Sequence, residues 1–185
     1  MLQEDLLDLI NNTRAWAFVG AGASMASGCP DWRGLLTAVV GRTEERARVE
    51  GNRAYQKALK QQRFPAAFAV IEEAVGRETL ERLVRRELQR HDSPSDFTRI
   101  LAQWPFAGYI TTNYDGLLEK ALGQLDPGWA SIGNTEFEAR KLSGGVDHVV
   151  WHLHGSIDPG VTSRLILTEG DYDSLYLHRH MPQVP

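Results

Sequence analysis

The sequence has 185 residues, of which 42% are apolar and 24% are charged, proportions that are typical of one soluble globular domain. Its net charge of −4 gives no electrostatic reason to expect a nucleic acid or a membrane surface as a partner. Because Cys29 is the only cysteine and no apolar run is long enough to cross a bilayer, we expect a cytoplasmic protein without disulfides, a thiolate zinc site or a membrane span.

The first part of the chain has the patterns of a helix, a strand and then a long helical segment. Residues 3–12 have the spacing of a short amphipathic helix. Residues 15–19 form an apolar run that ends at Gly20, which predicts a strand buried on both faces. Residues 34–103 then look helical, so we expect a helical insertion between the first strand and the next.

Charged residues mark one face of a predicted helix inside this insertion. Glu78 with Arg82 and Glu81 with Arg85 are four residues apart, a spacing that allows ion pairs on a helix surface. We expect a solvated face here rather than a nucleic-acid stripe, because the surrounding chain is acidic. The arginines of this face are Arg77, Arg82, Arg85, Arg86 and Arg90.

Strand patterns return in the second half of the chain, at residues 106–112, 148–153 and 164–168. Asp115 is placed to cap a helix that follows the first of them. Strands mixed with helices favour an α/β fold, a Rossmann-like parallel sheet flanked by helices, with residues 1–185 as a single domain. In such sheets ligands bind beyond the carboxyl ends of the strands, so the segments after these strands are candidates for a site.

A glycine loop, Gly-Ala-Gly-Ala-Ser, follows the first strand at residues 20–24. Glycines permit a tight turn and let backbone N–H groups approach a pyrophosphate. The dehydrogenase fingerprint needs a third glycine where Met25 stands and an acidic residue about 20 positions on, which residues 38–41 do not supply. A hydride-transferring Rossmann enzyme is therefore disfavoured, and by itself the loop fits a tight turn as well as a phosphate site.

The chain continues at residues 28–33 with Gly-Cys-Pro-Asp-Trp-Arg, and the two segments together resemble the nucleotide-binding loop of the sirtuins. In that family Gly-Ala-Gly-x-Ser is followed by Gly-x-Pro-Asp-Phe-Arg, so Trp32 stands in place of a phenylalanine. The resemblance implies that Asp31 and Arg33 belong to the nucleotide site. The Arg33 guanidinium could make charge-assisted, bidentate contacts with a pyrophosphate, and a surface arginine is the alternative.

A second segment, Tyr-Ile-Thr-Thr-Asn-Tyr-Asp at residues 109–115, resembles the Thr-x-Asn-x-Asp motif of sirtuin-like proteins, in the Thr-Asn-Tyr-Asp form seen in bacterial sirtuin-like domains. The Asn113 amide offers both a donor and an acceptor, so it could hold ribose hydroxyls or orient an attacking water. For Asp115 we expect a local role as helix cap and loop organiser.

A third segment, Val-Val-Trp-His-Leu-His-Gly-Ser, occupies residues 149–156, and strand alternation places His152 and His154 on one face. Two histidines there could ligate a metal, but no third ligand is evident beyond the nearby Asp158, so we expect none. The His-Gly pair resembles that of sirtuins, whose histidine acts as a general base. Because His154 is last on the predicted strand, we assign it as the base, with His152 in support.

The resemblance covers residues 15–160 and departs from the family in two respects. Protein-deacylating sirtuins carry a zinc module with two Cys-x-x-Cys pairs, which one cysteine cannot supply, so deacylation is disfavoured. After residue 168 nothing resembles the Gly-Ser/Thr-Ser loop that contacts the adenosine ribose, so we expect a C-terminally truncated domain or a short family variant. The zinc-free relatives include NAD-consuming effectors of bacterial antiviral defence.

The resemblance therefore implies an NAD hydrolase with NAD as its substrate, no metal, and a homo-oligomer or a partner defence protein as its assembly. A module that only senses NAD or ADP-ribose is the alternative, followed by a zinc-free deacylase or ADP-ribosyltransferase. Asn113 and His154 are the expected catalytic residues. The residues expected to bind the nucleotide are Gly20, Ala21, Gly22, Ser24, Asp31, Arg33, Thr112 and Asp115.

Overall fold

The chain divides into two compact units in a computed structural model. A sheet unit consists of Met1–Cys29 and Leu88–Arg164, and a helical unit consists of Pro30–Glu87 and Leu165–Pro185. Each unit thus combines segments that are far apart in the sequence. The described residues are 2–12, 15–144 and 147–176.

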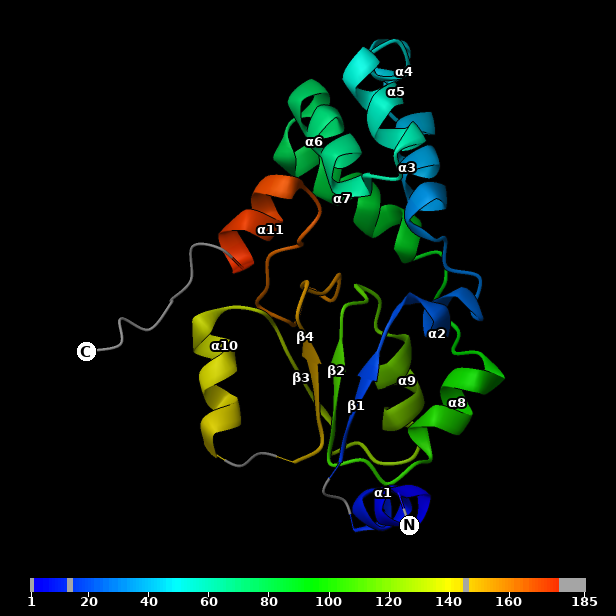
Figure 1. Ribbon diagram of the computed structural model, residues 1–185, viewed down its shortest axis with the longest axis vertical. Helices are drawn as coiled ribbons and strands as arrows, with labels where there is room; N and C mark the ends of the chain where they lie inside the picture. Colours follow the sequence, from blue (N-terminus) through cyan, green and yellow to red (C-terminus); the bar gives the residue numbers. More distant parts are fainter. Residues whose placement is uncertain (1, 13–14, 145–146, 177–185) are drawn as a thin grey trace, which may run out of the picture. The chain divides into compact units, whose positions relative to one another are not determined.

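The described part of the sheet unit contains four parallel strands in the order β1-β2-β4-β3 (Figure 1). These strands are β1 (Trp16–Val19), β2 (Gly108–Thr111), β3 (Ala130–Ile132) and β4 (Val149–His152). Phe18, Ile110, Trp151 and Ile132 lie in register across the sheet. The Rossmann-like parallel α/β sheet is confirmed, and so are the strands expected at the positions of β1, β2 and β4.

Two helices, α8 (Asp96–Ala102) and α9 (Leu117–Gly123), pack against one face of this sheet. Tyr109 and Val150, both fully buried, project from the strands into an apolar cluster that includes Leu118 of α9. Burying apolar area of this kind is worth roughly 25 cal/mol per Å² and is the main term that holds the helices to the sheet. A packed apolar core therefore holds the ends of these strands in place.

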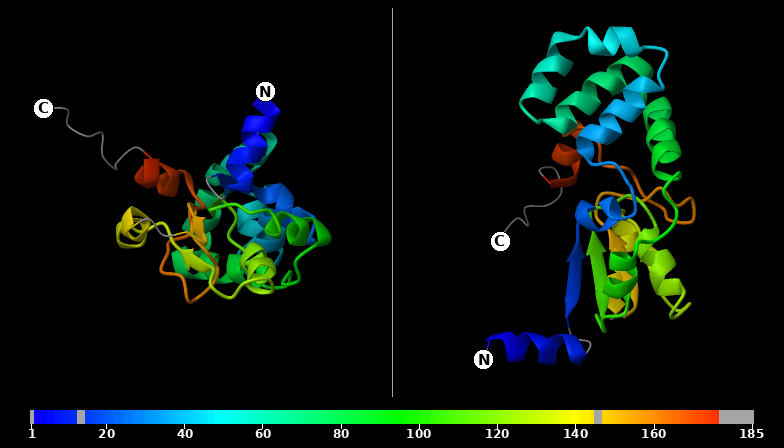
Figure 2. Two further views of the ribbon diagram at one scale, coloured as in Figure 1. Left: turned by 90° about the horizontal axis from the view of Figure 1, so that it is seen from below. Right: turned by 90° about the vertical axis from the view of Figure 1, so that its right-hand side faces the viewer.

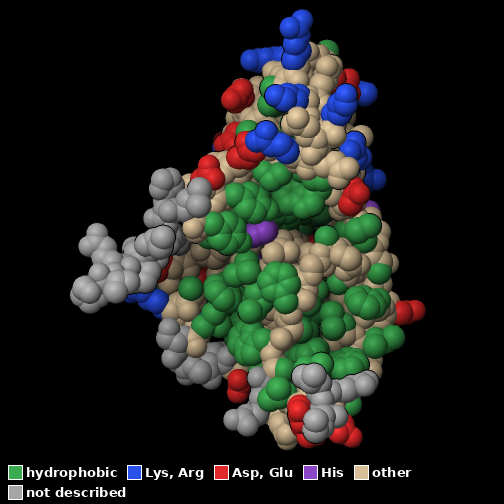
Figure 3. All heavy atoms as spheres, in the orientation of Figure 1, with side chains coloured by type: hydrophobic (Ala, Val, Ile, Leu, Met, Phe, Trp, Pro, Cys, Tyr) green, Lys and Arg blue, Asp and Glu red, His purple; other side chains and the backbone are tan. Residues whose placement is uncertain are grey.

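β1 lies at the edge of the sheet, and its side chains are not buried on both faces as the sequence suggested. Phe18 is 66% exposed and Trp16 is 37% exposed. The prediction was wrong because a continuous apolar run does not reveal whether helices cover both faces of a sheet. Trp16 instead packs over Gly108, where any Cβ would come within 2.6 Å of the indole ring. Apolar side chains accordingly gather on the surface over this part of the sheet (Figure 3).

Short elements complete the sheet unit. The first, α1 (Leu2–Asn11), confirms the expected N-terminal helix and lies beyond the amino end of β1 (Figure 2). After β1 comes α2 (Ala21–Met25), while α10 (Glu136–Arg140) and the 3₁₀ helix η1 (Lys141–Gly144) lie between β3 and β4 in the sequence. Within the described ranges, no helix is long and apolar enough to cross a membrane.

The expected helical insertion is present, since helices occupy most of residues 32–102. The helices of the helical unit are α3 (Trp32–Gly41), α4 (Arg46–Glu50), α5 (Arg53–Lys60), α6 (Phe64–Val75), α7 (Arg77–Leu88) and α11 (Glu169–Tyr176). The side chains of Asp31 and Asn52 accept backbone N–H bonds at the starts of α3 and α5. Leu36 and Phe68, both fully buried, belong to the core of this unit.

Residues 164–168 are largely buried but form no strand, contrary to the sequence prediction. Side chains bind their backbone in place of a neighbouring strand. The Asp171 carboxylate accepts from the N–H groups of Leu167 at 3.0 Å and Thr168 at 2.9 Å. Arg77 donates to a carbonyl of the same segment. A buried apolar segment can satisfy its backbone in either way, so hydrophobicity alone predicted the wrong element.

Arg77 is therefore not part of the solvated face predicted for α7. Its side chain is 25% exposed and pairs at 2.7 Å with Asp171, which is 1% exposed, and at 2.8 Å with Glu81. Burial raises the pKa of the Asp171 carboxyl, but hydrogen bonds from the Leu167 and Thr168 backbone and from Arg77 outweigh it and hold this pKa below its usual range. The charge pair joins α7 to α11 and to the segment before α11.

We expect Asp171→Asn to lower the free energy of unfolding by about 3 kcal/mol, because Arg77 loses a buried ionic partner. Glu169→Gln is the matched control, since it removes an exposed ion pair with Arg63 whose side chains are 57% and 47% exposed. That change should cost less than about 1 kcal/mol. Denaturant unfolding measures both variants, and equal losses would contradict the buried pair as the stronger contact.

Candidate active site

All three sequence motifs follow strands of the sheet unit at their carboxyl ends. β2 lies between β1 and β4, so the segment after β2 can bond to the segments after both neighbours. On the β4 side, Leu153 N–H donates to Thr111 O at 2.8 Å and Ile157 N–H donates to Tyr114 O at 2.8 Å. The Thr-Asn-Tyr-Asp and His-Gly segments are therefore joined through their main chains.

Asn113 joins the same segment to the glycine loop on the β1 side. Its Nδ2 atom donates to Gly20 O at 3.0 Å and to Ser24 Oγ at 2.8 Å. Because a carbonyl oxygen only accepts, the Gly20 contact fixes which amide atom is the nitrogen. Both amide hydrogens are thus used within the protein, and Oδ1 remains as an acceptor.

The glycine loop begins with Gly20 as the N-cap of α2 and places Gly22 in the first turn. A Cβ added at either glycine would meet no atom within 4 Å. Neither has a positive φ. Packing within the protein therefore does not require glycine at these positions, and the open space lets a ligand approach the backbone, including that of the exposed Ala21.

Thr111, the first residue of the Thr-x-Asn-x-Asp pattern, contributes to this site, although the sequence analysis selected Thr112 as the nucleotide contact. Its hydroxyl donates to Val19 O at 2.9 Å and accepts from the Asn113 N–H at 3.0 Å. Thr111 is 3% exposed, whereas Thr112, which the sequence analysis selected, is half-buried. Strand alternation was the available signal, since it places Thr111 on the same face as the buried Tyr109.

Asp115 binds the start of α9, the local role expected from the sequence, although Gly116 is the N-cap residue. The Asp115 Oδ1 atom accepts from the Leu117 N–H at 3.2 Å, at the start of α9. Burial raises the pKa of its carboxyl, and the Ser24 hydroxyl and Leu117 N–H lower it, while the nearby Glu119 raises it; the net direction is upward.

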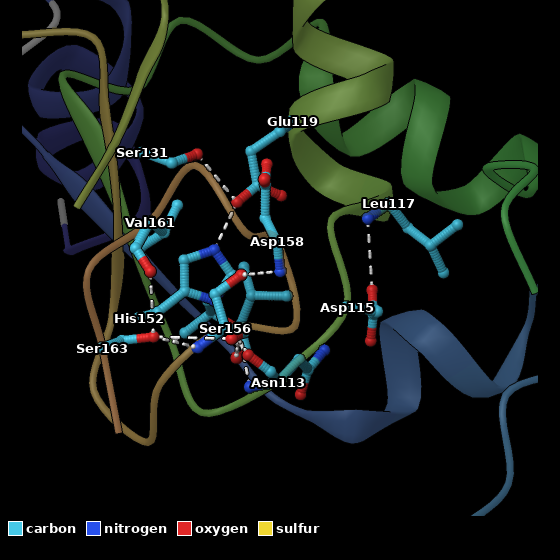
Figure 4. Close-up of polar contacts among 12 residues, drawn as sticks. Asn113, Asp115, Leu117, Glu119, Ser131, His152, Ser156, Asp158, Val161 and Ser163 are labelled. Carbon is cyan, nitrogen blue, oxygen red and sulfur yellow. Dashed lines mark hydrogen bonds and ion pairs between the residues drawn. The ribbon is translucent and has the colours of Figure 1, made fainter. Parts of the chain in front are cut away.

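His152, fully buried at the end of β4, links β4 to two other elements (Figure 4). Nδ1 lies 2.9 Å from Asn113 O, and Nε2 contacts the carboxylate of Glu119 on α9. The Ser131 hydroxyl on β3 donates to the same Glu119 oxygen at 3.1 Å. Burial lowers the pKa of His152, but Glu119, the Asn113 carbonyl and Asp115 outweigh it, so the pKa is raised. The sequence analysis missed Glu119, because nothing local relates α9 to β4.

His154 lies in the turn that follows β4, so its predicted place as the last strand residue was wrong. The strand ends at His152, and Gly155 bends the chain with a φ of +86°. Asn134, shortly after β3, supports this turn by donating to Leu153 O at 3.2 Å. His154 is 8% exposed, and burial lowers its pKa below the ordinary 6.5.

Asp31 and Arg33 belong to the helical unit, where both make local contacts. Asp31 accepts from the Gly34 N–H at 2.7 Å and caps α3. Arg33 donates to Leu59 O at 3.4 Å, and its guanidinium lies 5.8 Å from the ring centroid of Phe64. Their role in nucleotide binding stays a prediction.

A pocket of about 430 Å³ in the sheet unit adjoins the motif after β2. Apolar side chains of Leu117, Ile157 and Pro159 form part of its wall. Its titratable lining residues are His91, Asp92, Asp115, Glu119, Lys120 and Asp158. This predominantly acidic lining suits a ligand group that carries positive charge. Among the described residues, no three His, Cys, Asp or Glu side chains are grouped as metal ligands would be.

We expect Thr111→Val to lower the free energy of unfolding by about 1–3 kcal/mol, because the hydroxyl is lost from between the Val19 carbonyl and the Asn113 N–H. Valine keeps the shape of the buried side chain, so packing changes little. Thr112→Val is the control at a half-buried neighbour, for which a smaller loss is expected. A larger loss at Thr112 in denaturant unfolding would refute the assignment of Thr111 to the link between β1 and β2.

Comparison with known proteins points to the same family that the motifs resemble. Residues 107–184 match the family model described as a SIR2-like domain. The chain is 30% identical over 178 residues to the NAD(+) hydrolase ThsA of Cytobacillus dafuensis, covering 95% of this chain and 33% of the relative. It is 30% identical over 164 residues to the NAD(+) hydrolase ThsA of Acinetobacter baumannii, covering 87% and 31%.

The protein of the same name from Bacillus cereus is 25% identical over 173 residues, covering 92% of this chain and 33% of the relative. The chain thus spans about a third of the length of the curated relatives that it matches. Its parallel sheet is the architecture that the sirtuin resemblance implied. The match of residues 107–184 and the motifs at the strand ends thus agree in their similarity to SIR2-like domains.

Proposed function

We propose that this chain hydrolyses NAD at the bond between nicotinamide and ribose, giving nicotinamide and ADP-ribose. Similarity to relatives named NAD(+) hydrolase supports this proposal. The observation that carries it is the Asn113 amide, whose nitrogen is bound to the glycine loop while its oxygen remains to accept a hydrogen bond. An acceptor fixed in this way selects a ligand group that donates, such as a ribose hydroxyl or a water.

The glycine loop would receive the pyrophosphate. Gly20 and Gly22 face open space, so the backbone of Gly20, Ala21 and Gly22 can approach a phosphate without steric hindrance. Ser24 would act indirectly. Its hydroxyl oxygen accepts a hydrogen bond from Asn113, which connects the glycine loop to the residue that holds the reacting end of the substrate. The further proposed nucleotide contacts are Asp31, Arg33, Thr112 and Asp115.

The acidic pocket beside Asp115 would favour the cationic nicotinamide half of NAD. Glycoside cleavage passes through an oxocarbenium-like state in which positive charge develops on the ribose. The carboxylates of Asp92, Asp115 and Asp158, which line this pocket, would stabilise that charge when they are ionised. Glu119 is excluded from this role because its carboxylate is already engaged by His152.

His154 is the proposed general base. In the reaction the C–N glycosidic bond breaks, and its electron pair leaves with the pyridinium nitrogen, so nicotinamide departs neutral and needs no proton. A water oxygen bonds to the ribose C1′, and His154 accepts the proton that this water releases. Because burial lowers the pKa of His154, the imidazole is neutral and able to accept a proton at pH 7.

The resemblance to zinc-free bacterial defence effectors also suggests a biological role for the proposed reaction. Hydrolysis would deplete NAD during antiviral defence, with the chain acting in a homo-oligomer or together with a partner defence protein.

We expect Asn113→Ala and His154→Ala each to reduce nicotinamide release by about 100-fold or more. Asn113 positions the ribose hydroxyl or the water, and His154 accepts the proton that the attacking water releases. His148→Ala is the control, because His148 precedes β4 and lies at its opposite end. Chromatography of nicotinamide and ADP-ribose measures the reaction. Full activity of both variants would exclude this assignment. If NAD only protects the protein against thermal unfolding without turnover, the chain is a sensor instead.

Turnover should fall on acidification only below pH 6.5, because burial places the pKa of His154 below that ordinary value. The sign follows from the role: protonation at low pH removes the lone pair that accepts the proton, and activity returns as pH rises through the pKa. Profiles of kcat against pH test this expectation in the wild type. An acidic limb centred above pH 6.5 would argue against His154 as a buried, neutral base.

A further inference from the structure

His152 has a contact that determines where one of its protons lies. Its Nδ1 atom is 2.9 Å from the Asn113 carbonyl oxygen, which can only accept a hydrogen bond. Nδ1 must therefore carry a hydrogen. The imidazole side chain is fully buried, so no water competes for this bond.

The other ring nitrogen then faces a carboxylate. Nε2 contacts Glu119 Oε1, and a neutral ring with hydrogen on Nδ1 would direct a lone pair at that oxygen. The contact is attractive only when a further proton lies between the two atoms. The Ser131 hydroxyl donates to the same oxygen at 3.1 Å, and Glu119 Oε2 is buried without a hydrogen-bond partner among the described residues.

The charges around the ring favour that extra proton. Glu119 on α9 and Asp115 after β2 are the carboxylates that act on His152, while β3 contributes the neutral Ser131 hydroxyl. Burial alone would lower the pKa of His152, but these acidic groups and the Asn113 carbonyl raise it. These groups thus favour an imidazolium, which can donate a hydrogen bond from each ring nitrogen.

We propose that His152 and Glu119 form a positioning pair, which fixes the main chain of Asn113 and so aims the Asn113 amide oxygen at the substrate. The inference rests on the proposed NAD hydrolysis. Neither member touches the reacting atoms; the pair acts through Asn113 alone. The mechanism needs this support because Asn113 stands just beyond β2, where strand pairing no longer holds the main chain. A displacement of about 1 Å at a reacting group can cost about 100-fold in rate.

His152→Leu removes both bonds, and we expect it to lower kcat by about 100-fold while KM changes by less than about threefold. Since this change leaves the partly buried Glu119 without its cationic partner, the double variant His152→Leu with Glu119→Leu is made beside it. The double variant also removes the unpaired charge and so protects the fold. The same loss of kcat is expected in the double variant. Retention of wild-type kcat by a folded double variant overturns the proposal.

Glu119→Gln separates positioning from charge. The glutamine amide can donate to Nε2 of a neutral ring, while Nδ1 still donates to Asn113, so both bonds survive. We expect kcat at pH 7 within about threefold of wild type, against a loss of about 100-fold for Glu119→Ala. The control is His148→Gln, at the amino end of the same strand, where a half-exposed imidazole pairs with Asp126.

The alkaline limb of the profile of kcat against pH distinguishes a positioning pair from a purely structural one, because a purely structural role would leave this limb unchanged. In the wild type, rising pH removes the shared proton, Nε2 then faces the carboxylate with a lone pair, and turnover should decline. Glu119→Gln has no such proton to lose, so the alkaline decline should disappear. An identical alkaline limb in wild type and Glu119→Gln overturns the proposal.

Nitrogen NMR of the imidazole rings tests the pair without reference to turnover. In the full chain at pH 7, His152 should be protonated on both nitrogens in the wild type and on Nδ1 alone in Glu119→Gln. A neutral wild-type His152 with its hydrogen on Nε2 overturns the positioning pair, whatever the activity. Absence of nicotinamide release by the wild type instead overturns the proposed NAD hydrolysis, so the two failures are distinguishable.

Discussion

The end of β2 is hydrogen-bonded to both of its neighbours in the sheet, and the candidate site depends on that junction. On one side, Thr111 and Asn113 bind the carbonyls of Val19 and Gly20. On the other side, the Asn113 carbonyl meets His152 at the end of β4. A parallel sheet brings the carboxyl ends of its strands to one edge, but side chains must then hold the irregular segments that follow. Here that requirement is met by the buried side chains of Thr111 and His152 and by the half-buried Asn113.

Two histidines near the end of β4 differ in environment and therefore in chemistry. His152 is bonded on both ring nitrogens and surrounded by acidic groups, which raise its pKa despite burial. His154, two residues on, lies in a turn where burial is the dominant influence and lowers the pKa. One ring is thereby suited to hold a proton and the other to accept one. Proximity in the sequence does not imply similar roles, because a single turn changes the groups that each ring meets.

The helical unit uses charge differently. Asp171 is almost completely buried, yet it is stabilised by two backbone N–H groups and by Arg77, which together outweigh the cost of burying a carboxylate. This pair binds a segment that looks like a strand in the sequence but has no neighbouring strand. In both units, side chains therefore complete the hydrogen bonding of backbone that regular secondary structure leaves unpaired.

The sequence by itself determined the parallel α/β architecture and the positions of the glycine loop, Asn113 and Asp115 after their strands, because periodicity and turn-forming residues act over short distances. The tertiary structure decided which groups meet. Glu119 lies 33 residues from its partner His152, and no pattern within either segment relates the two. The exposure of Phe18 and the strandless burial of residues 164–168 likewise depend on which elements pack nearby, as does the turn that takes His154 off the strand. An apolar run records that a segment avoids water, but only the fold supplies the neighbours that bury it or satisfy its backbone.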